Sequence, residues 1–114
     1  MENVLEAKSF RFAIRIVKLC RLLNENKQEY TLTKQLLRSG TSIGANVTEA
    51  QQAQSRADFV SKLSIALKEA SETAYWLRLL HATDYLSAAE YETVAADCRE
   101  LERILTAAVK TANK

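Results

Sequence analysis

The chain has no proline and only two glycines in 114 residues, so almost nothing in it interrupts a helix. Proline and glycine disfavour helix interiors by about 3 and about 1 kcal/mol relative to alanine. Alanine, leucine, glutamate, lysine and arginine, which favour helices, are frequent. We therefore expect an all-α protein. Its length suits a single domain over residues 1–114.

The first half of the chain contains two amphipathic stretches. The first runs from about Val4 to Asn26 and carries two adjacent apolar rows: Phe12, Ile16, Leu19 and Leu23, and beside them Phe10, Ala13, Val17 and Cys20. A polar, non-periodic segment then forms a turn. The second stretch begins near Thr31 or Thr33, either of which is a suitable cap, and fades near Gln54.

Two capping signals divide the second half of the chain. Ser55 precedes a helix with Asp58 at its third position, and Ser87 with Glu90 forms a capping box that opens the last helix. Apolar residues then recur at alternating spacings of four and three up to Ala112. Four helices joined by short turns predict an antiparallel up-down-up-down four-helix bundle.

Gly40 and Gly44 lie one turn apart inside the second helix. Each carries a helix-propensity cost of about 1 kcal/mol, which close approach of another backbone would offset. We therefore expect a tight helix–helix contact here. Asn46 and Glu49 share a face near it with Ser42, and we expect both to hydrogen-bond across to the third helix as a packing network.

Residues 41–50, Thr-Ser-Ile-Gly-Ala-Asn-Val-Thr-Glu-Ala, resemble the Ser-Ile-x-x-Asn-Ile-x-Glu-Gly stretch of bacterial four-helix bundle proteins. These are the 23S rRNA intervening-sequence, or S23-type, proteins. Asp58-Phe59 and residues 63–77 look like the third-helix block of that family, and the likeness covers nearly the whole chain. One departure is Ala50, where the family often has glycine.

The resemblance implies a homo-oligomer, typically a ring of five subunits. The family is also similar to the accessory protein of diversity-generating retroelements, which binds nucleic acid and a reverse transcriptase. For most of the family the biochemical role is undefined, so the resemblance indicates the fold better than the function.

A basic stripe lies on one face of the first helix, with no acidic residue between Lys8 and Arg21. Its members are Lys8, Arg11, Arg15, Lys18 and Arg21. Such a row suits contact with a phosphate backbone. The alternative is an ordinary solvated face, or one paired with acids of the fourth helix. Glu92, Asp97, Glu100 and Glu102 are the available acids.

Tyr75, Trp76 and Leu79 lie at the edge of the third helix's apolar face. Aromatic residues are enriched in subunit contacts, so these three residues are candidates for an oligomer interface. The alternative is that a wide helix face buries them within one chain.

The remaining reactive side chains do not form a catalytic pattern. Cys20 and Cys98 lack zinc-type spacing and are expected to be buried reduced thiols, with a mutual disulfide as the alternative. His81, the single histidine, suits the dipole at a helix C-terminus. The Glu-x-x-His motifs of di-iron bundles do not occur. We expect no catalytic residue, cofactor or metal.

These observations predict a cytoplasmic, non-enzymatic bundle, with no apolar run of membrane-spanning length and no signal peptide. Its expected activity is electrostatic binding of RNA or another nucleic acid through the basic stripe. The main alternative is a protein–protein scaffold that does not contact nucleic acid. A small-molecule enzyme ranks third.

Overall fold

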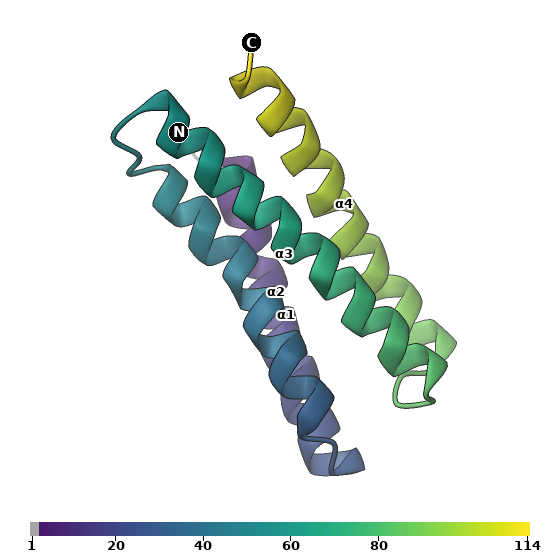
Figure 1. Ribbon diagram of the computed structural model, residues 1–114. Coiled ribbons are helices and arrows are strands. Elements are labelled where there is room, and N and C mark those ends of the chain that lie inside the picture. The colour runs from purple at the N-terminus through teal and green to yellow at the C-terminus, as the bar shows by residue number, and fades with distance from the viewer. Residues whose placement is uncertain (1–2) are drawn as a thin grey trace.

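The computed structural model describes residues 3–114 and contains four helices over that range (Figure 1). They are α1 (Val4–Lys27), α2 (Thr31–Ala50), α3 (Arg56–Ala82) and α4 (Ala88–Ala112). No strand occurs in the described part of the chain. The predicted all-α class is confirmed.

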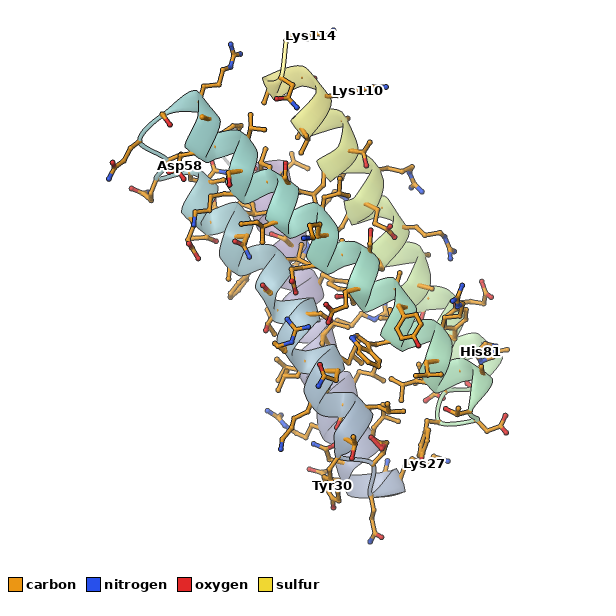
Figure 2. The ribbon with its side chains drawn as sticks, viewed as in Figure 1. Lys27, Tyr30, Asp58, His81, Lys110 and Lys114 are labelled. Carbon is orange, nitrogen blue, oxygen red and sulfur yellow. The ribbon has the colours of Figure 1, made fainter. Side chains whose placement is uncertain are left out.

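Each helix packs against the next one along the chain, and α1 also contacts α4 to a smaller extent. Short connections reverse the direction each time, so the bundle is antiparallel and elongated, with extents of 44 × 24 × 20 Å. The α1–α2 turn, with Lys27 and Tyr30, and the α3–α4 turn, close to His81, lie toward the same end of the bundle (Figure 2). The predicted four-helix bundle is therefore confirmed.

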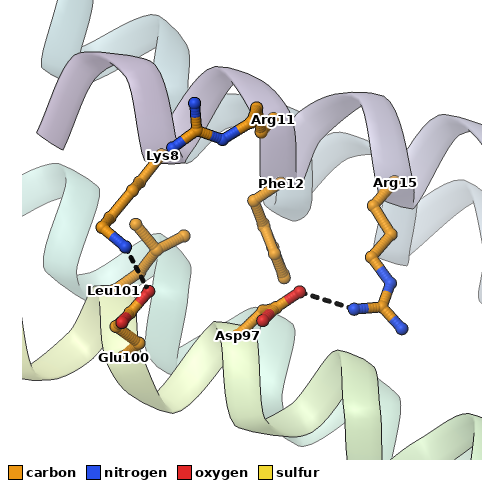
Figure 3. Close-up of a pocket in the computed structure, with 7 residues that line it drawn as sticks. All are labelled: Lys8, Arg11, Phe12, Arg15, Asp97, Glu100 and Leu101. Atoms are coloured by element: carbon orange, nitrogen blue, oxygen red, sulfur yellow. Dashed lines mark hydrogen bonds and ion pairs between the residues drawn. The ribbon is translucent and has the colours of Figure 1, made fainter. Parts of the chain in front are cut away.

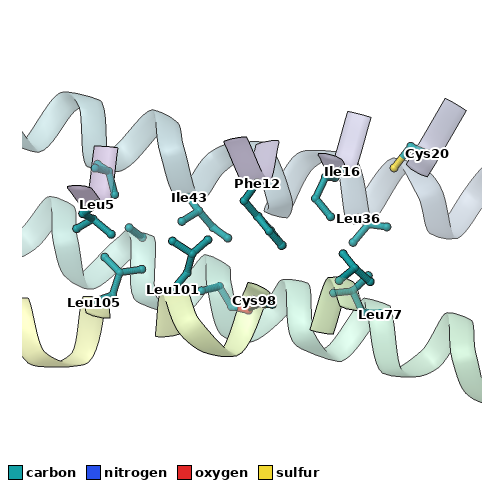
Figure 4. Packing of buried hydrophobic residues seen from close by; sticks show 14 of the residues in the cluster. Leu5, Phe12, Ile16, Cys20, Leu36, Ile43, Leu77, Cys98, Leu101 and Leu105 are labelled. Carbon is teal, nitrogen blue, oxygen red and sulfur yellow. Dashed lines mark hydrogen bonds between the residues drawn. The ribbon is translucent and has the colours of Figure 1, made fainter. Parts of the chain in front are cut away.

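The core runs along the middle of the bundle and receives side chains from all four helices (Figure 4). Its largest fully buried apolar side chains are Ile16, Leu36, Ile43, Leu63, Leu77, Leu80, Leu101 and Leu105. These residues belong to the apolar rows that the four–three spacing identified in the sequence. Burial of a leucine or isoleucine contributes about 1.5–3 kcal/mol, so these seams supply most of the driving force for folding.

One residue of the two predicted rows of α1 is exposed. The prediction that Phe10 is buried in the second row of α1 is wrong, because its side chain is 66% exposed. Helix α2 approaches α1 at Ser9 and Ile16, and Phe10 is one position further round the helix than Ser9. Consecutive residues are rotated by about 100° in an α-helix, which turns Phe10 away from α2.

The capping predictions are confirmed at two of three helix starts. Ser55 Oγ accepts a hydrogen bond from the Asp58 N–H at 3.0 Å, and Ser87 with Glu90 forms a complete capping box. The hydrogen bonds from Ser87 lower the pKa of Glu90. At the start of α2, neither Thr31 nor Thr33 is the cap.

The side chain of Glu29 takes that role at the start of α2. Its carboxylate accepts a hydrogen bond from the Leu32 N–H. Thr33 is buried and instead donates a hydrogen bond to Asn24 at 2.7 Å, which joins the start of α2 to the end of α1.

The two glycines lie where α2 crosses α1. A Cβ atom built at Gly40 would lie 2.8 Å from Ile16 Cγ2, and one at Gly44 would lie 3.3 Å from the Ser9 carbonyl oxygen. Ile16 is fully buried and has little room to move. The absence of a side chain at Gly40 therefore sets how closely these two helices pack.

Gly40→Ala is expected to destabilise the protein by about 1–2 kcal/mol, because overpacking against Ile16 exceeds the gain in helix propensity. Urea denaturation followed by circular dichroism measures this loss. Thr48→Ala, at an exposed position of the same helix, is the control and should be neutral or stabilising. Equal stability of Gly40→Ala and the wild type would contradict the steric explanation.

Candidate nucleic-acid interface

Helices α1 and α4 border a groove of about 320 Å³, and three cations of the predicted basic stripe line it: Lys8, Arg11 and Arg15. Two of the five cations cross this groove to acids of α4 (Figure 3). Lys8 Nζ lies 3.0 Å from Glu100 Oε1, and Arg15 Nη1 lies 2.5 Å from Asp97 Oδ2. The alternative of pairing with the fourth helix therefore applies to Lys8 and Arg15.

The other three cations of the stripe remain exposed. Arg11, Lys18 and Arg21 form no ion pair with any residue in the range 3–114. Arg11 lies between the two ion pairs in sequence, yet its guanidinium does not reach either acid (Figure 3). The positive surface is thus smaller than the sequence suggested, and it is centred on the outer side of α1.

Tyr75, Trp76 and Leu79 differ in their exposure. Tyr75 is 48% exposed, whereas Trp76 and Leu79 are half-buried and Trp76 packs against the core. Trp76 Nε1 donates a hydrogen bond to Glu72 at 3.0 Å, and its ring meets Tyr75 edge to face at 5.1 Å. Among these three residues, Tyr75 offers the most contact area to another molecule.

The polar residues beside the glycines form fewer contacts between helices than predicted. Glu49 forms an ion pair with Lys62 of α3 at 3.2 Å, but the prediction for Asn46 is wrong. Asn46 Nδ2 donates to the backbone oxygen of Ser42 at 2.9 Å and so bonds within α2. A spacing of four residues places Ser42 directly below Asn46 on the same helix face, where it is the nearest acceptor.

The ion pairs that link α2 to α3 were not predicted from the sequence. Arg38 forms ion pairs with both Glu69 and Glu72. A spacing of three between two acids marks one face of α3, but the sequence alone does not show which α2 cation reaches them.

Cys20 and Cys98 are buried and free, as expected, so the alternative disulfide is excluded. Burial raises the pKa of the Cys20 thiol to about 11 and that of the Cys98 thiol to about 12. Thiols that remain protonated at neutral pH are poor nucleophiles. Both therefore act as small apolar side chains.

His81 has a structural role beyond the helix dipole that the sequence suggested. Its Nδ1 lies 3.1 Å from the backbone oxygen of Leu86, and its ring stacks on Tyr91 with centroids 4.5 Å apart. These contacts join the end of α3 to the following turn and to α4.

A larger hollow of about 700 Å³ lies between the start of α3 and the end of α4. Its lining is largely apolar, with Phe59 and alanines of α4, and it offers no pair of groups for acid–base chemistry. Over residues 3–114, no cluster of three or more His, Cys, Asp or Glu side chains suits a metal ion. None of the helices over that range has the length and apolarity needed to cross a bilayer.

The fold and its surface define an all-α four-helix bundle with an exposed cationic helix. The model of the 23S rRNA-intervening sequence protein family matches residues 2–107, and the chain belongs to that family.

Similarity to a solved structure agrees with this assignment. A protein of unknown function from the S23 ribosomal protein family of Bacteroides thetaiotaomicron is 52% identical, with a TM-score of 0.93. The match covers 94% of this chain and 99% of that one. The curated proteins yielded no match.

The buried thiols predict a loss of stability in alkali. Thiols of the unfolded chain titrate near pH 9.0, whereas the folded thiols titrate at about 11 and about 12. Above pH 9 the unfolded state loses protons that the folded state retains, so the free energy of unfolding falls as pH rises. At pH 10 the loss should be about 1.4 kcal/mol per thiol.

Urea denaturation at pH 8 and pH 10, compared between the wild type and Cys98→Ala, measures this contribution. The variant should show a smaller decrease in stability between the two pH values. The same decrease in both proteins would mean that Cys98 does not contribute to the pH dependence.

Proposed function

We propose that this protein is a non-enzymatic nucleic-acid-binding bundle that contacts RNA through the exposed side of α1. The observation that carries the proposal is the set of three exposed cations, Arg11, Lys18 and Arg21, without an ion-pair partner in the described range. Cations in this arrangement bind phosphates by releasing condensed counterions and require no particular base sequence.

Two further observations support this proposal. The family is named for intervening sequences of 23S rRNA, which associates its members with RNA by name. Both thiols are protonated at neutral pH, which makes them poor nucleophiles, and the exposed cations of α1 suit the binding of an anion. Free thiols also suit the cytoplasm, which we propose as the location.

We also propose that the protein associates with further copies of itself, with five subunits as the resemblance implies. Tyr75 is the central residue of the proposed contact, and the half-buried Leu79 and the 39%-exposed Ile65 extend the apolar surface along α3. Association places several copies of the α1 cations in one assembly, which raises the overall affinity for a long RNA without a new kind of contact.

The double variant Arg11→Glu with Lys18→Glu is expected to abolish RNA binding, because it replaces two phosphate contacts with repulsion. Fluorescence anisotropy of a labelled structured RNA, measured over a salt series, tests this outcome. For the milder variant Arg11→Gln, the negative slope of log K against log salt should become less steep by about 1.

Arg103→Glu with Lys110→Glu is the matched control, since both cations are exposed on α4, their spacing of seven equals that of Arg11 and Lys18, and the change in net charge is identical. Its effect on binding should be small. Equal weakening by the two double variants would show that only net charge matters. Absence of wild-type binding at low salt would overturn the proposal and favour the scaffold alternative.

Tyr75→Arg is expected to lower the molar mass measured by light scattering toward that of one chain, because a charge would be buried in the proposed contact. Tyr75 is the appropriate position because Trp76 packs against the core, where a substitution would also destabilise the fold. Glu92→Arg, exposed on α4, is the control. An unchanged mass for Tyr75→Arg would exclude this face as the interface.

A further inference from the structure

Phe10 is the most exposed large apolar side chain among the described residues, at 66%. A phenylalanine buried in the core would stabilise the fold by about 1.5–3 kcal/mol, and an exposed one does not make this contribution. The neighbouring residues Ser9 and Phe12 are buried, so the helix itself is well packed at this point. Single exposed apolar side chains are common on protein surfaces, so the residues that surround Phe10 decide what its ring can bind.

Phe10 shares its side of α1 with the three unpaired cations. Phe10, Ile14, Lys18 and Arg21 recur at spacings of four, four and three. Arg11 is three residues before Ile14 and seven before Lys18, so it borders the same face on the side of the α1–α4 groove. All five are exposed. Such spacings place side chains on one face of a helix, so one exposed surface combines an aromatic ring, an apolar side chain and three positive charges.

We propose that this face of α1 binds unpaired nucleotides of RNA, with one base stacked on the Phe10 ring and the neighbouring phosphates held by Arg11, Lys18 and Arg21. The inference rests on the proposed function and adds the class of substrate to it. Exposed aromatic rings beside a cationic track are the usual means of binding single strands without sequence preference.

Duplex RNA does not fit this surface. Bases in an A-form helix are stacked on one another, so their faces are not accessible to a side chain on a protein surface. The three cations could still contact duplex phosphates, but Phe10 would gain nothing. The exposed ring therefore predicts a preference for loops, bulges and single strands over paired segments.

A second copy of the chain is a poorer occupant of this face. The centre of a protein–protein interface is depleted in charged residues, whereas here three cations are interleaved with the apolar side chains. The sequence from Lys8 to Arg21 contains no acid to balance them. A two-fold contact through this face would bring like charges together, and in a ring the facing surface of the next subunit would have to supply acids for three cations, whereas a phosphate backbone carries a negative charge at every nucleotide.

Competition binding distinguishes the two forms of RNA. A labelled single strand is titrated with the protein, and the unlabelled strand and its annealed duplex serve as competitors. We expect the single strand to compete better. Phe10→Ala should weaken single-strand binding about 5- to 150-fold, the effect of losing one stacked base, with an unchanged salt slope.

Three further variants separate stacking from apolar contact. Phe10→Tyr should retain affinity because it keeps the aromatic face, whereas Phe10→Leu should lose most of it. Leu22→Ala removes another exposed apolar side chain of α1, 53% exposed, and should bind as the wild type does. Light scattering of each variant should show the wild-type mass.

Two results would overturn the inference. One is unchanged single-strand affinity in Phe10→Ala while Arg11→Glu with Lys18→Glu abolishes binding; the proposed function would then stand without stacking. The other is a lower molar mass in Phe10→Ala, which would make Phe10 a subunit contact. Failure of the wild type to bind any RNA would instead overturn the proposed function and the inference together.

Discussion

The position of α2 depends on the contact between Gly40 and Ile16. A Cβ at Gly40 would lie 2.8 Å from Ile16 Cγ2, so only a residue without a side chain permits this separation of α1 and α2. The preceding residue, Ser39, accepts a hydrogen bond from Thr73 of α3 at 2.9 Å. Gly40 thus fixes the distance between α2 and α1, and Ser39 fixes the register of α2 against α3.

Helix α4 is held mainly by α3, and its limited contact with α1 leaves part of the α1 surface exposed. The outer part of the α1–α4 contact is formed by Lys8 with Glu100 and Arg15 with Asp97 rather than by apolar side chains. Partly exposed ion pairs contribute only about 0–1 kcal/mol each, so this side of the bundle remains an open groove bordered by charge.

The sequence was sufficient to predict the fold because each helix carries its own periodic apolar row, and capping residues or polar turn segments mark where the helices begin and end. Ser55 and the Ser87–Glu90 box mark two helix starts through local hydrogen bonds that depend on nearby residues alone. The interactions that were mispredicted depend on the rotation of one helix against another. Phe10 is turned away from α2, and Asn46 bonds to Ser42 within its own helix instead of reaching α3.

Three cations on one chain also constrain the proposed function quantitatively. Three phosphate contacts to a single strand give a salt slope of about −2, so a fourfold rise in salt weakens binding about 20-fold. One subunit alone would therefore bind weakly at physiological salt. Repetition of the α1 surface in an assembly multiplies the number of contacts and makes the second and later contacts intramolecular. The proposed self-association through α3 leaves α1 exposed, so it is compatible with RNA binding through α1. Appreciable affinity for RNA requires this association.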